Sequence, residues 1–267
     1  MATKQNADEI RQLVRERYQE VARSCSGGCC EATSSCCNGT SALASTYADQ
    51  LGYSPEEISS VPEAANMGLG CGNPQAIAAI KPGEVVLDLG SGGGLDCFLA
   101  AQQVGIEGHV IGVDMTPEMV SKARVNVDMA GIRNVEFRLG EIEHLPVADA
   151  SVDVILSNCV INLSPDKAQV FREAYRVLKP GGRLAISDVV ATAPIPDALR
   201  HDEALWGGCV SGAQEIGKLE EMLNAIGFQE VRVTPKAESR EFIREWVPGK
   251  SIEEYVVSAT IEAMKPR

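Results

Sequence analysis

Short apolar runs alternate with amphipathic stretches through most of the chain. A run bounded by Gly, Pro or Asp is typical of a buried parallel strand, and apolar residues spaced three and four apart predict a helix. These patterns predict strands at residues 85–88, 109–114, 135–139, 151–157 and 183–190, and helices at 95–104, 116–130, 166–178 and 215–226. Their alternation predicts an α/β fold with a doubly wound, mostly parallel sheet and right-handed crossovers.

The two ends of the chain depart from this regular alternation. Apolar residues at helical spacing predict an amphipathic helix over residues 8–23 that packs on the core as a cap. Residues 45–74 are expected to be mostly loop and short helix, and two late β-rich runs, 227–234 and 254–263, to complete the sheet with one antiparallel strand. We therefore expect an N-terminal segment (1–72), a core (73–192) and a small α+β C-terminal extension (193–267).

The turn after the first predicted strand is the most informative stretch. Residues 84–94 read EVVLDLGSGGG, so four of the six residues after Asp88 are Gly. Glycine lets the backbone approach a ligand closely, and the N-terminus of the following helix offers free N–H groups and the positive end of its dipole. This arrangement is typical of a loop that binds a nucleotide-like cofactor.

Elimination then selects the cofactor. The dinucleotide fingerprint G-x-G-x-x-G would require glycine at position 95, but this residue is Leu95. The turn also lacks the Gly-Lys-Ser/Thr motif of a P-loop. The second strand ends at Asp114, 20 residues past Gly94, where a carboxylate can accept hydrogen bonds from ribose hydroxyls. Asp88 would repel a pyrophosphate but tolerates a cationic sulfonium. The sequence therefore predicts a site for S-adenosylmethionine.

Charge and composition exclude several classes of partner. A net charge of −13 and a pI near 4.8 argue against nucleic acid, whose phosphates bind clustered Lys and Arg. The polar N-terminus does not resemble a signal peptide, and no apolar stretch reaches the ~18 residues that a membrane span requires. We expect a cytoplasmic protein without a nucleic-acid or membrane partner.

Nine cysteines are many for a reducing compartment, where disulfides are uncommon. Five of them, Cys25, Cys29, Cys30, Cys36 and Cys37, lie within residues 24–42, SCSGGCCEATSSCCNGTSA. Adjacent pairs do not match the C-x2-C spacing of zinc sites, so we favour a thiol-rich loop that handles a thiophilic ion or undergoes oxidation. A zinc knuckle with four cysteine ligands is the alternative.

Three further cysteines lie in predicted loops or at strand ends. Cys159 follows the fourth strand on the ligand edge of the sheet, and Cys71 and Cys209 lie in Gly-containing turns, where we expect accessible sulfurs. If the two turns fold over Cys159, three sulfurs face the methyl group of the cofactor. Three thiolates without His suit a soft, thiophilic ion. For Cys97, on the first core helix, we expect a buried core thiol.

Several stretches of the chain resemble the bacterial and archaeal arsenite S-adenosylmethionine methyltransferases. They are LGYSPEEISSVPEAANMGLGCGNP, VLDLGSGGGLDCFLAA, VIGVDMTPEMV, FRLGEIEHLPV, SNCVINLSPDK, VLKPGGRLAISD and WGGCVSGA. VLDLGSGGG alone indicates only a methyltransferase, whereas SNCVINLSPDK, GLGCGNP and GGCVSGA are far more specific. The resemblance implies the fold of class I S-adenosylmethionine-dependent methyltransferases. It also implies methyl transfer to thiol-bound trivalent arsenic, in arsenic detoxification.

The resemblance also implies roles for particular residues. Cys71, Cys159 and Cys209 are expected to hold trivalent arsenic, delivered as arsenite or a thiol conjugate. One cysteine of the N-terminal cluster, with Cys29 and Cys30 as candidates, is expected to join disulfide exchange, and thioredoxin or glutathione to reset the enzyme.

The cofactor is expected across the strand ends. The ribose is predicted on Asp114, the adenine near Met115, Glu141 and Ile142, and the methionine part near Gly90, Ser91 and Gly92, with Asp88, Gly140 and Asn158 completing the site.

Two other functions are compatible with parts of this pattern. One is methylation of a small organic acceptor such as a quinone precursor, which would leave the three loop cysteines without a role. The other is a thiol-rich metal-binding or scavenging protein, which would not bind S-adenosylmethionine.

Overall fold

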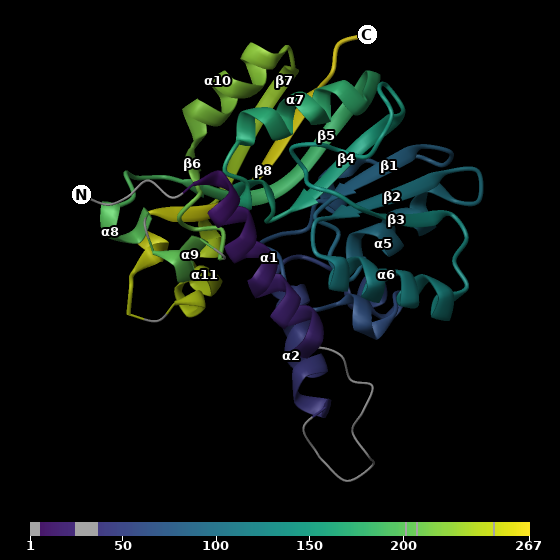
Figure 1. Ribbon diagram of the computed structural model, residues 1–267, viewed down its shortest axis with the longest axis horizontal. Coiled ribbons are helices and arrows are strands. Elements are labelled where there is room, and N and C mark those ends of the chain that lie inside the picture. The colour runs from purple at the N-terminus through teal and green to yellow at the C-terminus, as the bar shows by residue number, and fades with distance from the viewer. Residues whose placement is uncertain (1–5, 25–36, 201, 207, 248) are drawn as a thin grey trace.

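A mostly parallel, twisted sheet organises the chain (Figure 1). The computed structural model describes residues 6–24, 37–200, 202–206, 208–247 and 249–267. The strands are β1 (Val85–Leu89), β2 (His109–Asp114), β3 (Val135–Leu139), β4 (Val152–Asn158), β5 (Leu178–Ala191), β6 (Gln214–Glu215), β7 (Gln229–Lys236) and β8 (Val256–Met264). Their order is β3-β2-β1-β4-β5-β8-β7, with β6 paired to β5.

Helices cover both faces of this sheet. The α-helices are α1 (Ala7–Ser24), α2 (Cys37–Gln50), α3 (Pro55–Ser59), α4 (Gln75–Ala78), α5 (Leu95–Val104), α6 (Pro117–Ala130), α7 (Lys167–Val177), α8 (Asp197–Arg200), α9 (Glu203–Trp206), α10 (Ile216–Ile226) and α11 (Arg240–Trp246). Short 3-10 helices are η1 (Glu63–Ala65), η2 (Ile161–Leu163), η3 (Ala237–Ser239) and η4 (Ile252–Glu254). Among the residues just described, no helix has the length and apolar character needed to cross a membrane.

The alternation of side chains along the strands explains the two layers. In β1, Leu87 and Leu89 belong to the core beneath α7 and α10, whereas Val86 belongs to the core beneath α4, α5 and α6. Successive residues of a strand point to opposite faces, so an apolar run in a central strand is buried on both sides. Phe171 of α7 and Phe98 of α5 are fully buried on the two opposite faces. The predicted doubly wound fold is confirmed.

The far edge of the sheet contains one reversed strand, as the sequence predicts. β8 pairs antiparallel with both β5 and β7, while the other pairings are parallel. The boundary at β5 differs from the prediction that Lys179–Gly182 precede the strand, because the strand already begins at Leu178, opposite Val152. A register shift between Val152 and Val154 accommodates this Pro- and Gly-containing stretch inside a strand.

The segment before β1 contains more helix than its composition indicates. Residues 37–50 form α2, although we expected mostly loop from position 45 onward. Ala48 in α2 and the following Leu51 and Tyr53 are buried in the core that contains α5, and this packing outweighs weak helix propensity. A short helix expected in this segment is α3, which Ser54 caps through reciprocal hydrogen bonds with Glu57.

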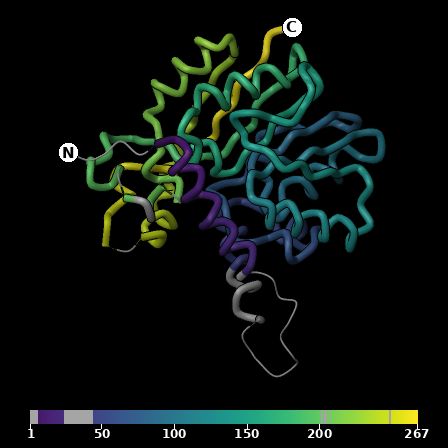
Figure 2. The backbone as a smooth tube through the Cα atoms, viewed as in Figure 1, coloured from purple at the N-terminus to yellow at the C-terminus, as the bar shows by residue number. Residues whose placement is uncertain are grey.

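Helix α1 crosses the middle of the molecule (Figure 2), and charged pairs hold it. Arg11 lies 3.3 Å from the buried Glu143, Arg15 lies 3.3 Å from Glu141, and Arg23 lies 3.0 Å from Glu118. These acids belong to the loop after β3 and to the first turn of α6, which follow neighbouring strand ends. The predicted amphipathic cap is therefore placed over the carboxyl edge of the sheet.

Arg183 on β5 joins the sheet to the segment before β1. Its Nε and Nη2 atoms donate to the carbonyl oxygens of Ala78 and Ala79, at 2.6 and 2.7 Å, where α4 ends. Its guanidinium also forms two 2.8 Å hydrogen bonds to the carboxylate of Glu84. One side chain thus satisfies two terminal carbonyls and a carboxylate.

We predict that Arg183→Met lowers the free energy of unfolding by about 1.5–3 kcal/mol, because these acceptors lose their charged donor. Urea unfolding followed by circular dichroism measures the change. Arg172→Met is the matched control: its guanidinium is about half exposed and 3.9 Å from Asp166, so a loss below about 0.5 kcal/mol is expected. Equal losses in both variants would contradict a special role for Arg183.

Candidate active site

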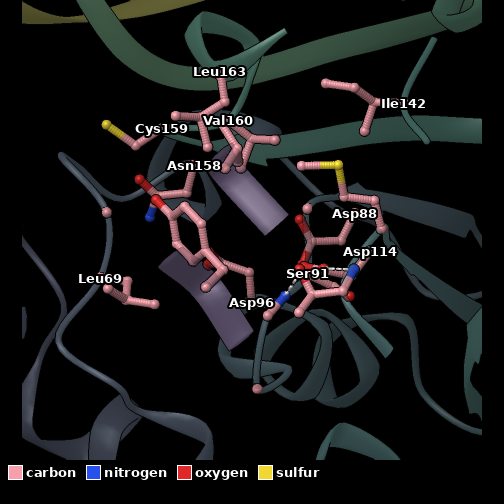
Figure 3. Close-up of a pocket in the computed structure, with 18 of the residues that line it drawn as sticks. Leu69, Asp88, Ser91, Asp96, Asp114, Ile142, Asn158, Cys159, Val160 and Leu163 are labelled. Carbon is pink, nitrogen blue, oxygen red and sulfur yellow. Dashed lines mark hydrogen bonds between the residues drawn. The ribbon is translucent and has the colours of Figure 1, made fainter. Parts of the chain in front are cut away.

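A pocket of roughly 1050 Å³, including open solvent, lies at the carboxyl ends of β1, β2 and β4 (Figure 3). Eight residues expected to bind the cofactor line it: Asp88, Gly90, Ser91, Gly92, Asp114, Met115, Ile142 and Asn158. Gly140 and Glu141 are not among the lining residues. Glu143 lines the pocket instead, while Glu141 pairs with Arg11 and Arg15 of α1.

The Gly-rich turn adopts backbone conformations that only glycine takes easily. Gly90, Gly92 and Gly94 have φ values of 68°, 51° and 97°. A Cβ atom at Gly90 would lie 2.5 Å from a methyl group of Val160, so a larger residue would clash with the Val160 side chain. Gly94 then begins α5, whose N-terminus faces the pocket.

Three buried carboxyl groups give the pocket an acidic lining, and burial disfavours their ionised forms. Burial raises the pKa of Asp88 and of Asp114, and it raises the pKa of Asp96 to about 6. Among the described lining residues Arg11 is the one cation, and it is already paired with Glu143. A bound cation offsets the cost of burying these carboxylates, and a sulfonium is such a cation.

Backbone donors shape the acid at the end of β2. Asp114 accepts hydrogen bonds from the N–H groups of Gly92, at 3.0 Å, and Thr116, at 2.8 Å. These contacts tie the Gly-rich turn to the strand end and fix the orientation of the carboxylate. The hydroxyl of Ser91, also in the turn, is buried and has no hydrogen-bond partner within the described part of the chain. A buried hydroxyl without a partner in a pocket fits a ligand that supplies one, so the residues present fit S-adenosylmethionine.

Asn158, at the end of β4, connects the cofactor pocket to the turn that carries Cys71. Its Oδ1 accepts the N–H of Cys71 at 3.0 Å, and its Nδ2 donates to the carbonyl of Gly72 at 2.7 Å and to the Tyr53 hydroxyl at 3.0 Å. Tyr53 in turn donates to Asp96 at 2.9 Å. A Cβ atom at Gly70 would lie 2.9 Å from the Asn158 amide, which explains Gly before Cys71.

The three loop cysteines come together beside this amide. The thiol sulfurs of Cys71 and Cys159 and a carboxylate oxygen of Asp188 all lie within 4.8 Å of one another. The Cys209 thiol donates to the carbonyl oxygen of Cys159 at 2.7 Å, and all three cysteines belong to one buried cluster. Cys159 also lines the cofactor pocket. The thiols therefore adjoin the place where a methyl donor fits.

The expectation of accessible sulfurs at Cys71 and Cys209 was wrong. Cys71 is 1% exposed, Cys159 7% and Cys209 2%. Flanking glycines allow the Cys71 turn to pack tightly, and Ser258 on β8 donates to the Cys71 carbonyl at 2.6 Å. Glycine next to a cysteine therefore indicates close backbone packing here, not exposure.

The environments of Cys71 and Cys159 favour the protonated form of these two thiols. Burial raises the pKa of Cys71, and burial together with the neighbouring thiols of Cys209 and Cys71 raises the pKa of Cys159. Cys159 and Cys209 also have left-handed backbones, with φ of 60° and 64°, which non-glycine residues seldom adopt. Such strain concentrates at functional sites.

Several residues of the site are not among those predicted from the sequence. Tyr53, Asp96, Asp188, Arg11 and Tyr18 reach it from other segments. Tyr53, Asp96 and Asp188 fall within the stretches that carry the family resemblance, whereas Arg11 and Tyr18 of α1 lie outside every one of them. Cys97 is a buried thiol as expected, and it donates to Asp88 at 3.3 Å. Cys25, Cys29, Cys30 and Cys36 lie outside the described residues, and so does the side chain of Cys37.

Strand order, the Gly-rich turn and an acidic pocket at the strand ends together define a class I S-adenosylmethionine-dependent methyltransferase. In agreement, a family model described as a methyltransferase domain matches residues 80–227. An arsenite methyltransferase of Halobacterium salinarum is 54% identical over 273 residues, covering 100% of this chain and 69% of that protein. The chain belongs to the arsenite methyltransferase family.

Two further relatives agree with this assignment. An arsenite methyltransferase of Aquipseudomonas alcaligenes is 49% identical over 179 residues, covering 64% of this chain and 51% of that protein, so the match there spans about half the relative. A crystal structure of an arsenic(III) S-adenosylmethionine methyltransferase from Chlamydomonas reinhardtii has a TM-score of 0.61 and 34% identity. It covers 85% of this chain and 73% of that one.

We predict that affinity for S-adenosylmethionine falls about fourfold between pH 7.5 and 5.5. A cation favours ionised carboxylates, so protons compete with it once the pH drops through the Asp96 pKa of about 6. Isothermal titration calorimetry at both pH values measures the change.

Asp96→Asn is the matched variant, because an amide can still accept the Tyr53 hydrogen bond but does not titrate. It should bind the cofactor more weakly at pH 7.5 and lose most of the pH dependence. If the affinity of Asp96→Asn for the cofactor still fell about fourfold between pH 7.5 and 5.5, a group other than Asp96 would be responsible for the pH dependence.

Proposed function

We propose that this protein transfers a methyl group from S-adenosylmethionine to trivalent arsenic held by Cys71, Cys159 and Cys209, in arsenic detoxification. The observation that carries the proposal is the convergence of three buried thiols at the wall of the cofactor pocket, with Cys159 common to both. Trivalent arsenic is soft and takes three sulfur ligands while keeping a lone pair. The Halobacterium salinarum relative is an arsenite methyltransferase and the Chlamydomonas reinhardtii structure is that of an arsenic(III) methyltransferase, which supports this substrate.

When the thiols are protonated, arsenite binds with no net release or uptake of protons. Arsenite, As(OH)3, exchanges its three hydroxyl groups for three sulfurs, and each departing oxygen takes the proton of one thiol and leaves as water. The raised pKa values of Cys71 and Cys159 support this route. A thiol conjugate of arsenic exchanges in the same way, each thiol proton passing to the departing thiol.

The residues of the strand ends would hold the donor. Asp114 is assigned to the ribose, Met115 and Ile142 to the adenine, and the turn at Gly90–Gly92 to the methionine part. Gly140 and Glu141, in the loop after β3, remain proposed cofactor contacts, although Glu143 is the acid of that loop that lines the pocket. When bound, S-adenosylmethionine supplies an electrophilic methyl group, which the lone pair of arsenic attacks. The chain contributes proximity and alignment of donor and acceptor.

Methylation oxidises arsenic, so a reductive step must follow. When two sulfurs leave arsenic as a disulfide, arsenic gains two electrons and returns to the trivalent state. We assign the relay of this disulfide to the N-terminal cysteines, with Cys29 and Cys30 as candidates. Thioredoxin or glutathione would then reduce the chain, which fits a cytoplasmic setting.

The two competing functions explain less of the site. A methyltransferase for a small organic acceptor gives no reason for three buried thiols beside the donor pocket. A scavenging protein gives no reason for the Gly-rich turn, the orphaned Ser91 hydroxyl and the three acids. Arsenic methylation gives a role both to the three buried thiols and to the donor pocket.

We predict that Cys159→Ser and Cys209→Ser each abolish methylation of arsenite, because a hydroxyl is a poor ligand for a soft ion. Cofactor binding should persist in both variants. Methylarsenite needs only two sulfurs, so Cys71→Ser is expected to retain activity on it. X-ray absorption should show three As–S contacts in the wild type and fewer in each variant.

Cys97→Ser is the control, because its thiol faces Asp88 and lies outside the three-cysteine cluster. It should keep three As–S contacts. Oxygen neighbours around arsenic in the wild type, or full activity of Cys159→Ser, would overturn the assignment.

We further predict that replacing the five cysteines at positions 25–37 with Ser leaves the fold intact. Methylation of free arsenite should slow more than methylation of a preformed thiol conjugate, if these thiols deliver arsenic. Circular dichroism and product analysis by liquid chromatography measure the two effects. Equal slowing for both substrates would argue against delivery, and a stoichiometric zinc lost in the variant would favour the zinc knuckle.

A further inference from the structure

Helix α1 forms one wall of the cofactor pocket. Arg11, Val14 and Tyr18 all line it, and their spacing of three and four residues places them on one face of the helix. Val14 is 1% exposed, so this face is firmly packed. The ion pairs of Arg11, Arg15 and Arg23 with Glu143, Glu141 and Glu118 hold the helix in this position.

Tyr18 lies where the donor pocket and the thiol cluster meet. It lines the pocket together with Asp88, Asp114 and Met115, and it also packs against the cluster that contains Cys71, Cys159 and Cys209. Burial raises the pKa of Tyr18, and the nearby Cys209, Cys159 and Asp114 raise it further. The Tyr18 side chain therefore borders both the donor pocket and the thiol cluster.

We propose that Tyr18 is a positioning residue for the methyl donor, whose aromatic ring stabilises the sulfonium at the boundary with the thiol cluster. An aromatic face attracts a cation through its quadrupole, and the attraction is strongest where water is excluded. The surrounding acids give the pocket the same preference for positive charge. The identity of the acceptor rests on the proposed function, whereas donor binding by Tyr18 does not.

A phenol suits this place only while it keeps its proton. A phenolate beside an electrophilic methyl group would itself be a nucleophile and would compete with the acceptor. A tyrosine hydroxyl is neutral at physiological pH, and burial, which raises the pKa of Tyr18, acts in the same direction. The ring then supplies π electrons and shape without being methylated.

The test compares a charged ligand with an uncharged one. S-adenosylhomocysteine lacks the sulfonium charge but keeps the adenosine and amino acid parts of the donor. Calorimetry without arsenic should show that Tyr18→Leu raises the Kd for S-adenosylmethionine about tenfold and the Kd for S-adenosylhomocysteine less than twofold. Tyr18→Phe, which keeps the ring, should hold both values within about twofold of wild type.

Val14→Ala is the matched control on the same face of α1. It removes packing without removing a ring, so it should weaken both ligands by the same factor. Equal weakening of both ligands by Tyr18→Leu, or a loss in Tyr18→Phe as large as in Tyr18→Leu, would overturn the proposal. Because no arsenic is present, a failure here is distinct from a failure of the arsenic assignment.

Discussion

The side-chain amide of Asn158 is the contact on which the rest of the site depends. It stands at the end of β4, directly before Cys159, and binds both the N–H of Cys71 and the carbonyl of Gly72. Through Tyr53 it also reaches Asp96 in the cofactor pocket. An amide offers a donor and an acceptor at once, so a carboxylate here would lose the bonds to Gly72 and Tyr53. The position of one thiol relative to another thus follows from one polar side chain.

Charge gives the second constraint. Asp88, Asp96 and Asp114 are buried next to one another, although burial of an uncompensated carboxylate is costly. Part of the cost is met by backbone N–H donors to Asp114 and by the hydroxyl and amide donors around Asp96. The remainder is relieved when a cation binds. These buried acids therefore favour binding of the sulfonium, and α1 adds an aromatic side chain to the wall of the pocket.

The regular part of the molecule is predictable from sequence because its signals are local. The apolar run before Asp88, the Gly-rich turn and the Asp that ends β2 each follow from residues within a few positions. The pocket wall from α1 is different, since Tyr18 reaches it by tertiary packing alone. Likewise, the helix at 37–50 depends on burial of Ala48 against the core. Contacts across a hundred residues, such as Tyr53 with Asn158, leave no periodic trace in the sequence.

The cysteines show why residue type was easier to interpret than environment. The Cys71 thiol lies between two glycines and was expected to be exposed. Position 70 is glycine for another reason: the Asn158 amide leaves no room there for a side chain. Cys159 and Cys209 occupy left-handed backbone positions that glycine would fill without strain. Glycine, however, has no sulfur to offer. Retaining Cys at a cost of about 1–3 kcal/mol per strained residue makes sense only if the thiol itself is needed there. The backbone geometry, independent of any relative, therefore argues that these two sulfurs serve chemistry rather than packing.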